Sequence, residues 1–318
     1  MTYSVGGQIQ ASDYNGFVGT TAVNAAYSSS AAATSKMAAL MGVGYGNRGY
    51  GQTSASLATV AVGNTVAAAE WNNLRSAMSA MNTHQGSGLT LQPVVSAGGT
   101  ILAEDGTLSR PNISTLITSL DTNRLNASIT DMTVTAALTS SQATGWTGTV
   151  QHVFTAVFGT VDQARYYFNS GGQIRFSGSN TGATTPAGTA WATLLSAMGT
   201  ISFGASTTTY TGSGGTITNN IGYYGLTTSP QQIFIHNGAA PYGGIYYAIS
   251  IQTNAIGTAN GSNGSTITCT ATFNDTAAPH GPVTGTTTST INSYKASNAG
   301  ALNNPAVAAP TFTTTTPL

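Results

Sequence analysis

The clearest pattern in this chain is Ser265-Thr-Ile-Thr-Cys-Thr-Ala-Thr-Phe273, a stretch in which hydroxyl and apolar side chains alternate. Successive side chains of a β-strand point to opposite faces, so the apolar residues from Ile267 to Phe273 share one face. This stretch is expected to be a strand with one face against a core. Cys269 lies on that face and is the only cysteine, so it is expected to be a buried small hydrophobe without an intrachain disulfide.

The same alternation recurs through the second half of the chain, between turns rich in Gly, Asn and Ser. Several short strands separated by frequent turn signals favour an antiparallel β-sandwich or barrel. One short helix, 190–199, interrupts the strands and ends at its glycine. The candidate strands are Thr149–Phe158, Gln173–Ser177, Thr200–Phe203, Gln231–His236, Gly244–Gln252 and Ser265–Asn274.

The first part of the chain contains an internal repeat, residues 5–17 and 62–74, at an offset of 57 residues. Each copy opens with Val-Gly and later places an acid, an aromatic residue and an asparagine in succession. The acid is expected in the first turn of a helix, at the positive end of the helix dipole, and the aromatic residue is expected to anchor that helix on a shared core. We interpret six positions as a docking or assembly site: Asp13, Tyr14 and Asn15 in the first copy, and Glu70, Trp71 and Asn72 in the second.

Apolar residues at helical spacing predict helices over Ala67–His84 and Ile113–Asn126, with a weaker helix in the first copy of the repeat. The chain is therefore expected to be mainly β with an N-terminal α-helical region. The expected divisions are a helical docking region at 1–127, a linker or the beginning of the sheet at 128–145, an antiparallel β domain at 146–294, and an extended C-terminal tail at 295–318 that neighbouring chains hold.

Charged residues are almost absent from the second half of the chain, where only Asp275 and Lys295 follow Arg175. Enzymes usually draw on ionisable groups with shifted pKa values, so this composition indicates a structural or adhesive protein and not an enzyme. The formal net charge of zero leaves little self-repulsion and favours association between copies. Nucleic acid is not an expected partner, because the eight Lys and Arg residues form no basic cluster.

Neither a metal site nor a cofactor site is predicted. The four histidines lie far apart in the sequence, and the adjacent acids Glu104 and Asp105 are typical of a turn. The glycine- and tyrosine-rich stretch 42–51 lacks the strand, helix and lysine that accompany a phosphate-binding loop, so it is interpreted as a contact loop. Asp162 and Arg165 are spaced to pair across one helical turn.

Tyrosines gather in two places of the expected β domain, beside Asn, Gln and Gly. Such side chains can stack on neutral sugars and hydrogen-bond to their hydroxyl groups, and tyrosine is also favoured at protein interfaces. Glycan contact, subunit contact and plain burial all stay open at this point. The residues concerned are Tyr223, Tyr224, Tyr242, Tyr246 and Tyr247.

Six short motifs follow one another over roughly the first 180 residues: Ala11-Ser-Asp-Tyr-Asn15, Gly49-Tyr-Gly-Gln52, Ala69-Glu-Trp-Asn-Asn-Leu74, Thr83-His-Gln-Gly86, Thr122-Asn-Arg-Leu125 and Ala164-Arg-Tyr-Tyr-Phe-Asn-Ser-Gly-Gly172. In their order and spacing they resemble virion structural proteins of tailed bacteriophages, of the kind found in phages of cyanobacteria. Such proteins are tail, fibre or other particle components without an assigned catalytic residue. The resemblance therefore implies a location in the virion, often with trimeric assembly for fibre-like members, and no site residues.

We expect a tail, baseplate or fibre component that assembles with copies of itself and with other virion proteins. Contact with a host surface glycan is the sharper hypothesis. The alternatives are a capsid decoration or neck protein, a filament-forming subunit and, from another class, a glycan depolymerase using Asp162, Glu104 or Asp275. No secretory signal or membrane-spanning stretch is recognised, so synthesis in the host cytoplasm as a soluble chain without membrane insertion is expected.

Overall fold

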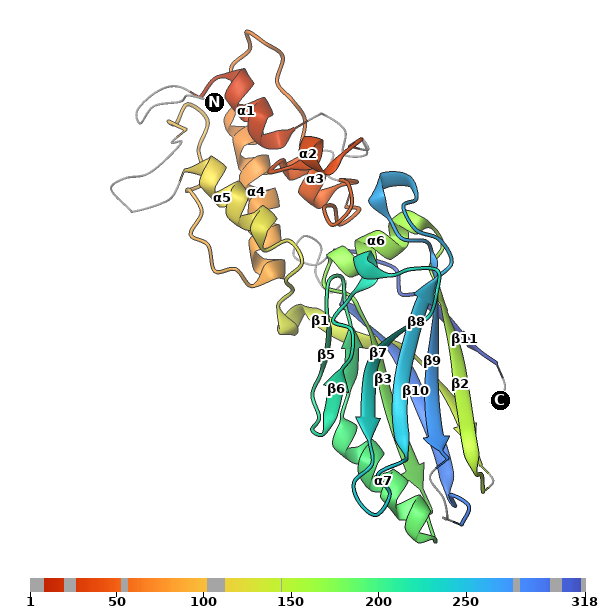
Figure 1. Ribbon diagram of the computed structural model, residues 1–318. Coiled ribbons are helices and arrows are strands. Elements are labelled where there is room, and N and C mark those ends of the chain that lie inside the picture. Colours follow the sequence, from red (N-terminus) through yellow and green to blue (C-terminus); the bar gives the residue numbers. More distant parts are fainter. Residues whose placement is uncertain are drawn as a thin grey trace.

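The computed structural model describes residues 9–19, 27–52, 57–101, 112–143, 145–276, 281–297 and 305–315. A helical part lies at one end of the molecule and a longer β part extends from it (Figure 1). The helical part holds α1 (Ala11–Val18), α2 (Ser30–Ala33), α3 (Met37–Met41), α4 (Ala68–Gln85) and α5 (Ile113–Thr122). The β part carries two further helices, α6 (Val161–Asn169) and α7 (Pro186–Met198).

The strands of the β part pair antiparallel in two sheets, which pack as a sandwich and do not close into a barrel. The prediction of a mainly β chain with antiparallel sheets and N-terminal helices is confirmed. In sheet order, the five-stranded sheet is β1 (Met132–Gln142), β10 (Thr286–Ala296), β3 (Gln173–Thr181), β4 (Ile201–Phe203) and β5 (Thr208–Tyr210). The six-stranded sheet is β11 (Thr311–Thr314), β2 (Gly148–Val157), β9 (Thr266–Asp275), β8 (Tyr246–Thr253), β7 (Gln231–Asn237) and β6 (Gly215–Ile217).

The core of the sandwich lies between the sheets and includes the inner face of β9. The alternating apolar residues from Ile267 to Phe273 are all buried there, as predicted. The Phe273 ring centroid lies 5.6 Å from that of Trp191 in α7 and 4.9 Å from that of Tyr247 in β8. Since burying one large apolar side chain contributes about 1.5–3 kcal/mol, this aromatic group is a main source of stability for the β part.

Two long strands of the five-stranded sheet, β1 and β10, are missing from the list of candidate strands, although the sheet was allowed to begin within 128–145. The inward positions of β10 include Thr287, Ser289 and Ser293, which are at most 1 % exposed. Polar residues therefore occupy both faces of β10, and the apolar alternation that marks a strand is lost. Residues 132–142 form β1, so of the two expectations for the segment 128–145, a linker or the beginning of the sheet, the structure has the second.

The C-terminal tail binds to its own chain over its described residues. Thr311–Thr314 pair with residues 157–154 of β2 as the short outer strand β11, and Phe312 packs against the sandwich core. This intrachain pairing satisfies backbone groups of these four residues locally, and contact of the tail with neighbouring chains stays a prediction.

The helical part has a core of its own beneath α1, α4 and α5. Helix α4 lies within one residue of the predicted span at each end, whereas α5 begins at the predicted Ile113 but ends four residues early, at Thr122. Trp71, Leu74 and Met78 of α4 lie on the inner side and are at most 1 % exposed. The predicted helical spacing of apolar residues is confirmed for α4.

Candidate functional site

The acids of the internal repeat cap their own helices. The Asp13 carboxylate accepts a hydrogen bond from the Gln10 backbone N–H at 3.2 Å, and the Glu70 carboxylate accepts one from the Ala67 N–H at 2.6 Å. Each acid stands in the first turn, where it also meets the positive end of the helix dipole. The predicted first-turn position is confirmed, and the two carboxylates serve local helix structure.

The aromatic residues of the repeat belong to the core of the helical part. Tyr14 is 0 % exposed and Trp71 is 1 % exposed. The Tyr14 hydroxyl donates to the Glu70 carbonyl oxygen at 3.2 Å, which connects the two copies directly. Burial, with the Glu70 charge nearby, raises the pKa of Tyr14 to about 12. Neither ring is available to a partner in this structure.

The asparagines of the repeat each bind one residue of an extended segment through both of its backbone groups. The Asn15 side-chain amide donates to the Val60 carbonyl and accepts from the Val60 N–H, both at 2.8 Å. Asn72 makes the same two bonds with Val95, at 2.8 Å and 3.0 Å. Each amide therefore replaces the donor and the acceptor that a neighbouring strand would supply.

The positions of these two valines reveal a third copy of the opening of the repeat, at residues 97–101. Each valine lies two residues before a similar stretch, Val-Gly-Asn-Thr-Val at 62–66 and Ala-Gly-Gly-Thr-Ile at 97–101. Gly63 and Gly98 have φ values of 89° and 78°, a region that residues with side chains rarely adopt. The asparagine of one copy therefore binds the chain immediately before the next copy begins.

Segments from all three copies line one pocket of about 610 Å³ in the helical part. Its walls come from residues 9–12, 62–66 and 99–101, and none of the lining residues is charged. Residues 5–8 of the first copy lie outside the described residues. The third copy is not recognisable from the sequence pattern of the first two, because Gly106 and Thr107 stand where those copies have the aromatic residue and the asparagine. Its Gly-Thr-Ile opening was the signal that could have found it.

The docking interpretation of the six repeat residues is replaced by an internal role. Two of their side chains cap helices, two fill a core and two bind peptide groups of the same chain. A side chain that already satisfies buried polar groups cannot bind a partner without breaking those bonds. The repeat is the framework of the helical part.

We expect Asn72→Ala to lower the free energy of unfolding by about 1–3 kcal/mol, since it removes the partner of both backbone groups of Val95. Asn73→Ala is the matched control, because it makes the same change of helix propensity one position along α4 without touching that pair of bonds. Urea unfolding of the two variants measures the difference. An equal loss of stability in both would contradict the role assigned to Asn72.

A second cluster joins the helical part to the β part around Arg165 of α6. The Arg165 side chain is 0 % exposed and pairs with Asp162 at 3.1 Å, one helical turn earlier, as predicted. Its guanidinium also donates to the backbone carbonyls of Val43, Gly46 and Arg48, at 3.2 Å for Gly46 and 2.7 Å for Arg48. The glycine- and tyrosine-rich stretch is therefore a contact loop between the two parts of its own chain.

Neutral polar side chains complete this junction. The Asn169 amide donates to the Gly46 carbonyl at 3.0 Å, and the Tyr224 hydroxyl lies 2.7 Å from both that carbonyl and the Asn169 side-chain oxygen. The Asn260 side chain donates to the Asp162 carboxylate at 3.1 Å, and its backbone carbonyl accepts from the Gly46 N–H at 2.7 Å. With Arg165 and its partners, these hydrogen bonds join four segments and fix the two parts against each other.

The five tyrosines that were candidates for glycan or subunit contact differ in burial. Tyr223 and Tyr247 are 0 % exposed, so both are core residues and sugar stacking is excluded for them in this fold. Tyr224 has its hydroxyl in the junction. Tyr242 and Tyr246 are half-buried, and they keep the contact interpretation open.

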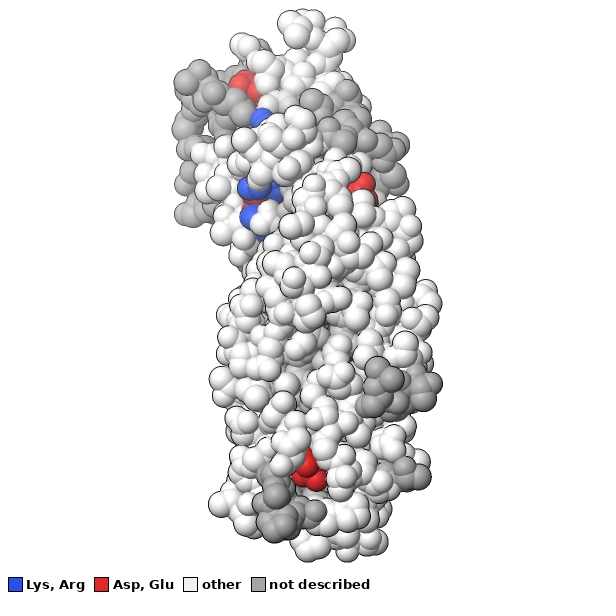
Figure 2. Space-filling view, turned by 45° about the vertical axis from the view of Figure 1, so that its right-hand side comes forward, with Lys and Arg blue, Asp and Glu red and all other residues white. Residues whose placement is uncertain are grey.

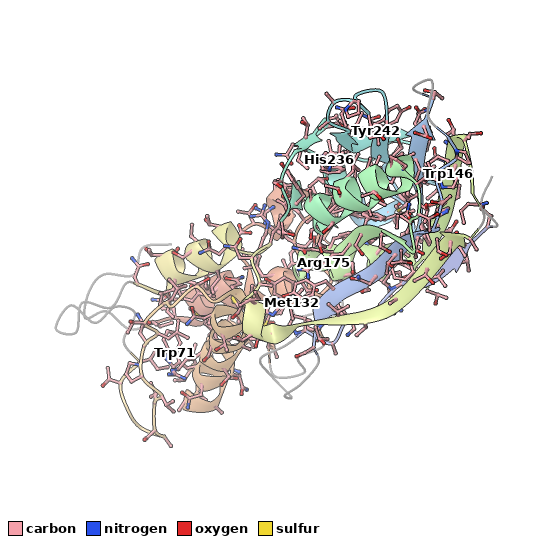
Figure 3. The ribbon with its side chains drawn as sticks, turned by 90° about the horizontal axis from the view of Figure 1, so that it is seen from below. Trp71, Met132, Trp146, Arg175, His236 and Tyr242 are labelled. Carbon is pink, nitrogen blue, oxygen red and sulfur yellow. The ribbon has the colours of Figure 1, made fainter. Side chains whose placement is uncertain are left out.

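Tyr242 lines a pocket of about 300 Å³ between α7 and the loop that follows β7. This pocket lies at the end of the β part that is remote from the helical part (Figure 1). His236 lines it as well, and Figure 3 shows the two residues close together beside α7. Burial lowers the pKa of His236, while a hydrogen bond with the Leu194 backbone opposes that shift. The pocket has no charged lining residue.

Within the described part of the chain, no three His, Cys, Asp or Glu side chains are grouped to hold a metal ion. Of the acids considered for a depolymerase, Asp162 is bound to Arg165, Asp275 is 6 % exposed, and Glu104 lies outside the described residues. Among the described helices, none has the length and apolar character needed to span a bilayer. Comparison with protein-family models, curated proteins and solved structures finds no match to this chain.

Proposed function

We propose that this chain is a noncatalytic structural component of a bacteriophage particle, in a tail, baseplate or fibre, that assembles with copies of itself. The observation that carries the self-assembly is the scarcity of exposed charge on the β part. Asp275 and Lys295, the only charged residues after Arg175, are 6 % and 8 % exposed. The Lys295 ammonium donates to the carbonyls of Ala296 and Val307, each at 3.0 Å. Figure 2 accordingly shows a face with only a few small charged spots.

The outer face of the six-stranded sheet supports the same proposal. It is the face opposite to that of Cys269, and hydroxyl, amide and small apolar side chains cover it. Three rows in register across β2, β9 and β8 are Gln151, Thr272 and Ala248, then Val153, Thr270 and Ser250, then Thr155, Thr268 and Gln252. A flat face without charge meets no electrostatic repulsion from a like surface, which favours packing within an assembly.

The particle itself is proposed from the six motifs of the first 180 residues or so, and from no structural feature. Other virion proteins are proposed as further partners, and nucleic acid is not. A capsid decoration or neck protein and a filament-forming subunit are the alternatives, because both would share this uncharged surface. Contact with a host glycan is proposed only at the half-buried Tyr242 and Tyr246.

The test is the solution mass of the purified chain by light scattering, with electron microscopy of the same sample. A discrete oligomer is expected, because copies with little surface charge and a formal net charge of zero associate readily. Long polymers would favour the filament alternative, and a stable monomer at micromolar concentration would overturn the proposal of self-assembly. Release of reducing sugar from host polysaccharide would overturn the noncatalytic assignment.

A further inference from the structure

We propose that the outer edge of β1, over residues 138–141, pairs with the same edge of a second copy of this chain. The two strands would run antiparallel across a two-fold axis and continue the five-stranded sheet from one copy into the other. This inference rests on the proposed self-assembly, for which it names the surface.

The four outer strands of the sandwich are not alike. The five-stranded sheet ends in β1 and β5, and the six-stranded sheet ends in β6 and β11. Strands β5 and β6 have three residues each and β11 has four, whereas β1 has eleven. Proteins usually protect the outer strands of sheets by shortening them or by placing charges and prolines in them. Strand β1, Met-Thr-Val-Thr-Ala-Ala-Leu-Thr-Ser-Ser-Gln, has neither a charge nor a proline.

A β-bulge divides β1 into two halves. The register with β10 shifts between Thr135 and Leu138, and Ala136 has a φ value of 51°. A bulge locally disrupts the edge and hinders pairing at that point. Beyond it, residues 138–142 pair without interruption with residues 291–287 of β10. The regular half of the strand is therefore the part with an evenly spaced row of outer backbone groups.

Alternate side chains of this half of β1 are exposed. Thr139 and Ser141 are exposed, Ser140 between them is 6 % exposed, and Figure 3 shows β1 running along the outer border of the molecule from the labelled Met132. Nearer the start of the strand, Val134 is 54 % exposed, and Ile129 just before β1 is 80 % exposed. Large apolar side chains at this level of exposure add area that a partner would remove from water.

A second copy is the partner that this edge fits. An antiparallel strand pair is self-complementary, because each strand offers the same donors and acceptors to the other, and a two-fold contact uses one patch on both copies. The edge is uncharged and the chain has a formal net charge of zero, so two copies meet no repulsion there. An acidic or basic partner would find no opposite charge on this strand.

A charge on the edge gives the first test. Thr139→Lys is expected to raise the apparent dissociation constant of the assembly about tenfold or more, because two ammonium groups would lie close to the two-fold axis. Thr228→Lys is the matched control, since Thr228 is an exposed threonine in the loop before β7, away from β1. Sedimentation or light scattering gives the mass of each variant, and circular dichroism confirms that the fold is kept.

A covalent test uses the fact that Cys269 is buried and that burial raises the pKa of its thiol, so it is unreactive. The double variant Thr139→Cys with Ser141→Cys is expected to form disulfide-linked dimers under mild oxidation with copper phenanthroline. Thr228→Cys is expected to stay unlinked.

The outcomes separate the two proposals. A parent chain with an even number of copies, dissociated by Thr139→Lys but not by Thr228→Lys, would support pairing through β1. A discrete trimer, or an assembly whose mass is unchanged by Thr139→Lys, would overturn the pairing through β1. The proposed self-assembly would still hold. A monomeric parent chain would overturn both.

Discussion

Replacing Arg165 with methionine is expected to lower the free energy of unfolding by about 3–5 kcal/mol. The Arg165 guanidinium is 0 % exposed, and it holds Asp162 together with three backbone carbonyls of the contact loop. Methionine fills much of the same space but offers no donor, so these buried acceptors lose their partner. The effect is concentrated at the contact between the two parts of the molecule, because the carbonyls belong to the helical part and Arg165 to the β part.

Arg175→Met is the matched control for this experiment. Arg175 lies half-buried on β3, where its guanidinium carbon is 3.3 Å from the Tyr294 ring centroid and its side chain donates to Gln173. Contacts of this kind contribute about 0.5–1 kcal/mol, so the control should lose much less stability than Arg165→Met. Losses within 1 kcal/mol of each other in the two variants would contradict the importance of the junction.

Tryptophan fluorescence can show where the Arg165 variant fails. Trp71 reports on the core of the helical part, whereas Trp146 and Trp191 report on the sandwich. Loss of the junction is expected to separate one unfolding transition into two, seen as two steps in the tryptophan fluorescence, one from Trp71 and one from Trp146 and Trp191. A single transition that only moves to lower denaturant would show that the two parts stay coupled by other contacts.

The sequence predicts strands where the inner face is apolar and misses them where it is polar. Strand β9 places every second residue from Ile267 to Phe273 in the core, so its period of two is visible. Strand β10 buries Thr287 and Ser289 at corresponding inner positions, and no apolar period marks it. Its place in the sheet comes from pairing with β1 and β3 on both sides, which is long-range information that one sequence does not display.

In the candidate sites, too, contacts between residues close in the sequence could be predicted, whereas contacts between distant residues could not. The first-turn acids and the Asp162–Arg165 pair depend on residues within one helical turn, and both were predictable. Asn15 reaches across 45 positions to Val60, and the contact loop meets Arg165 more than 100 positions later. Side-chain type alone also cannot separate a buried tyrosine such as Tyr247 from a half-buried one such as Tyr242, because strand register sets their exposure.

Acid is expected to destabilise the β part through His152 of β2. The His152 side chain is 0 % exposed, its ring centroid lies 5.1 Å from that of Phe273, and neither ring nitrogen has a hydrogen-bond partner among the described residues. Burial lowers the pKa of His152 from 6.5 to about 4. Between these two values the unfolded chain takes up a proton that the folded chain does not. The stability contributed by neutral His152 is therefore present above pH 6.5 and is lost as the pH falls toward 4, by about 3 kcal/mol in total.

The comparison of His152→Leu with Phe154→Leu isolates this effect. Both residues are on the inner face of β2 and at most 1 % exposed, but only the first substitution removes a titrating group. Denaturant unfolding at pH 7 and pH 4 should show about 3 kcal/mol less acid destabilisation for His152→Leu than for the parent chain, because every other titrating group is shared and cancels in the difference. Phe154→Leu should lose stability at both pH values and keep the parent's pH dependence, since its cost comes from lost packing. If His152→Leu kept the pH dependence of the parent chain, the prediction would be wrong. His152 would then be protonated in the folded chain at pH 4, and the interior of the sandwich would have to provide a partner for its charge.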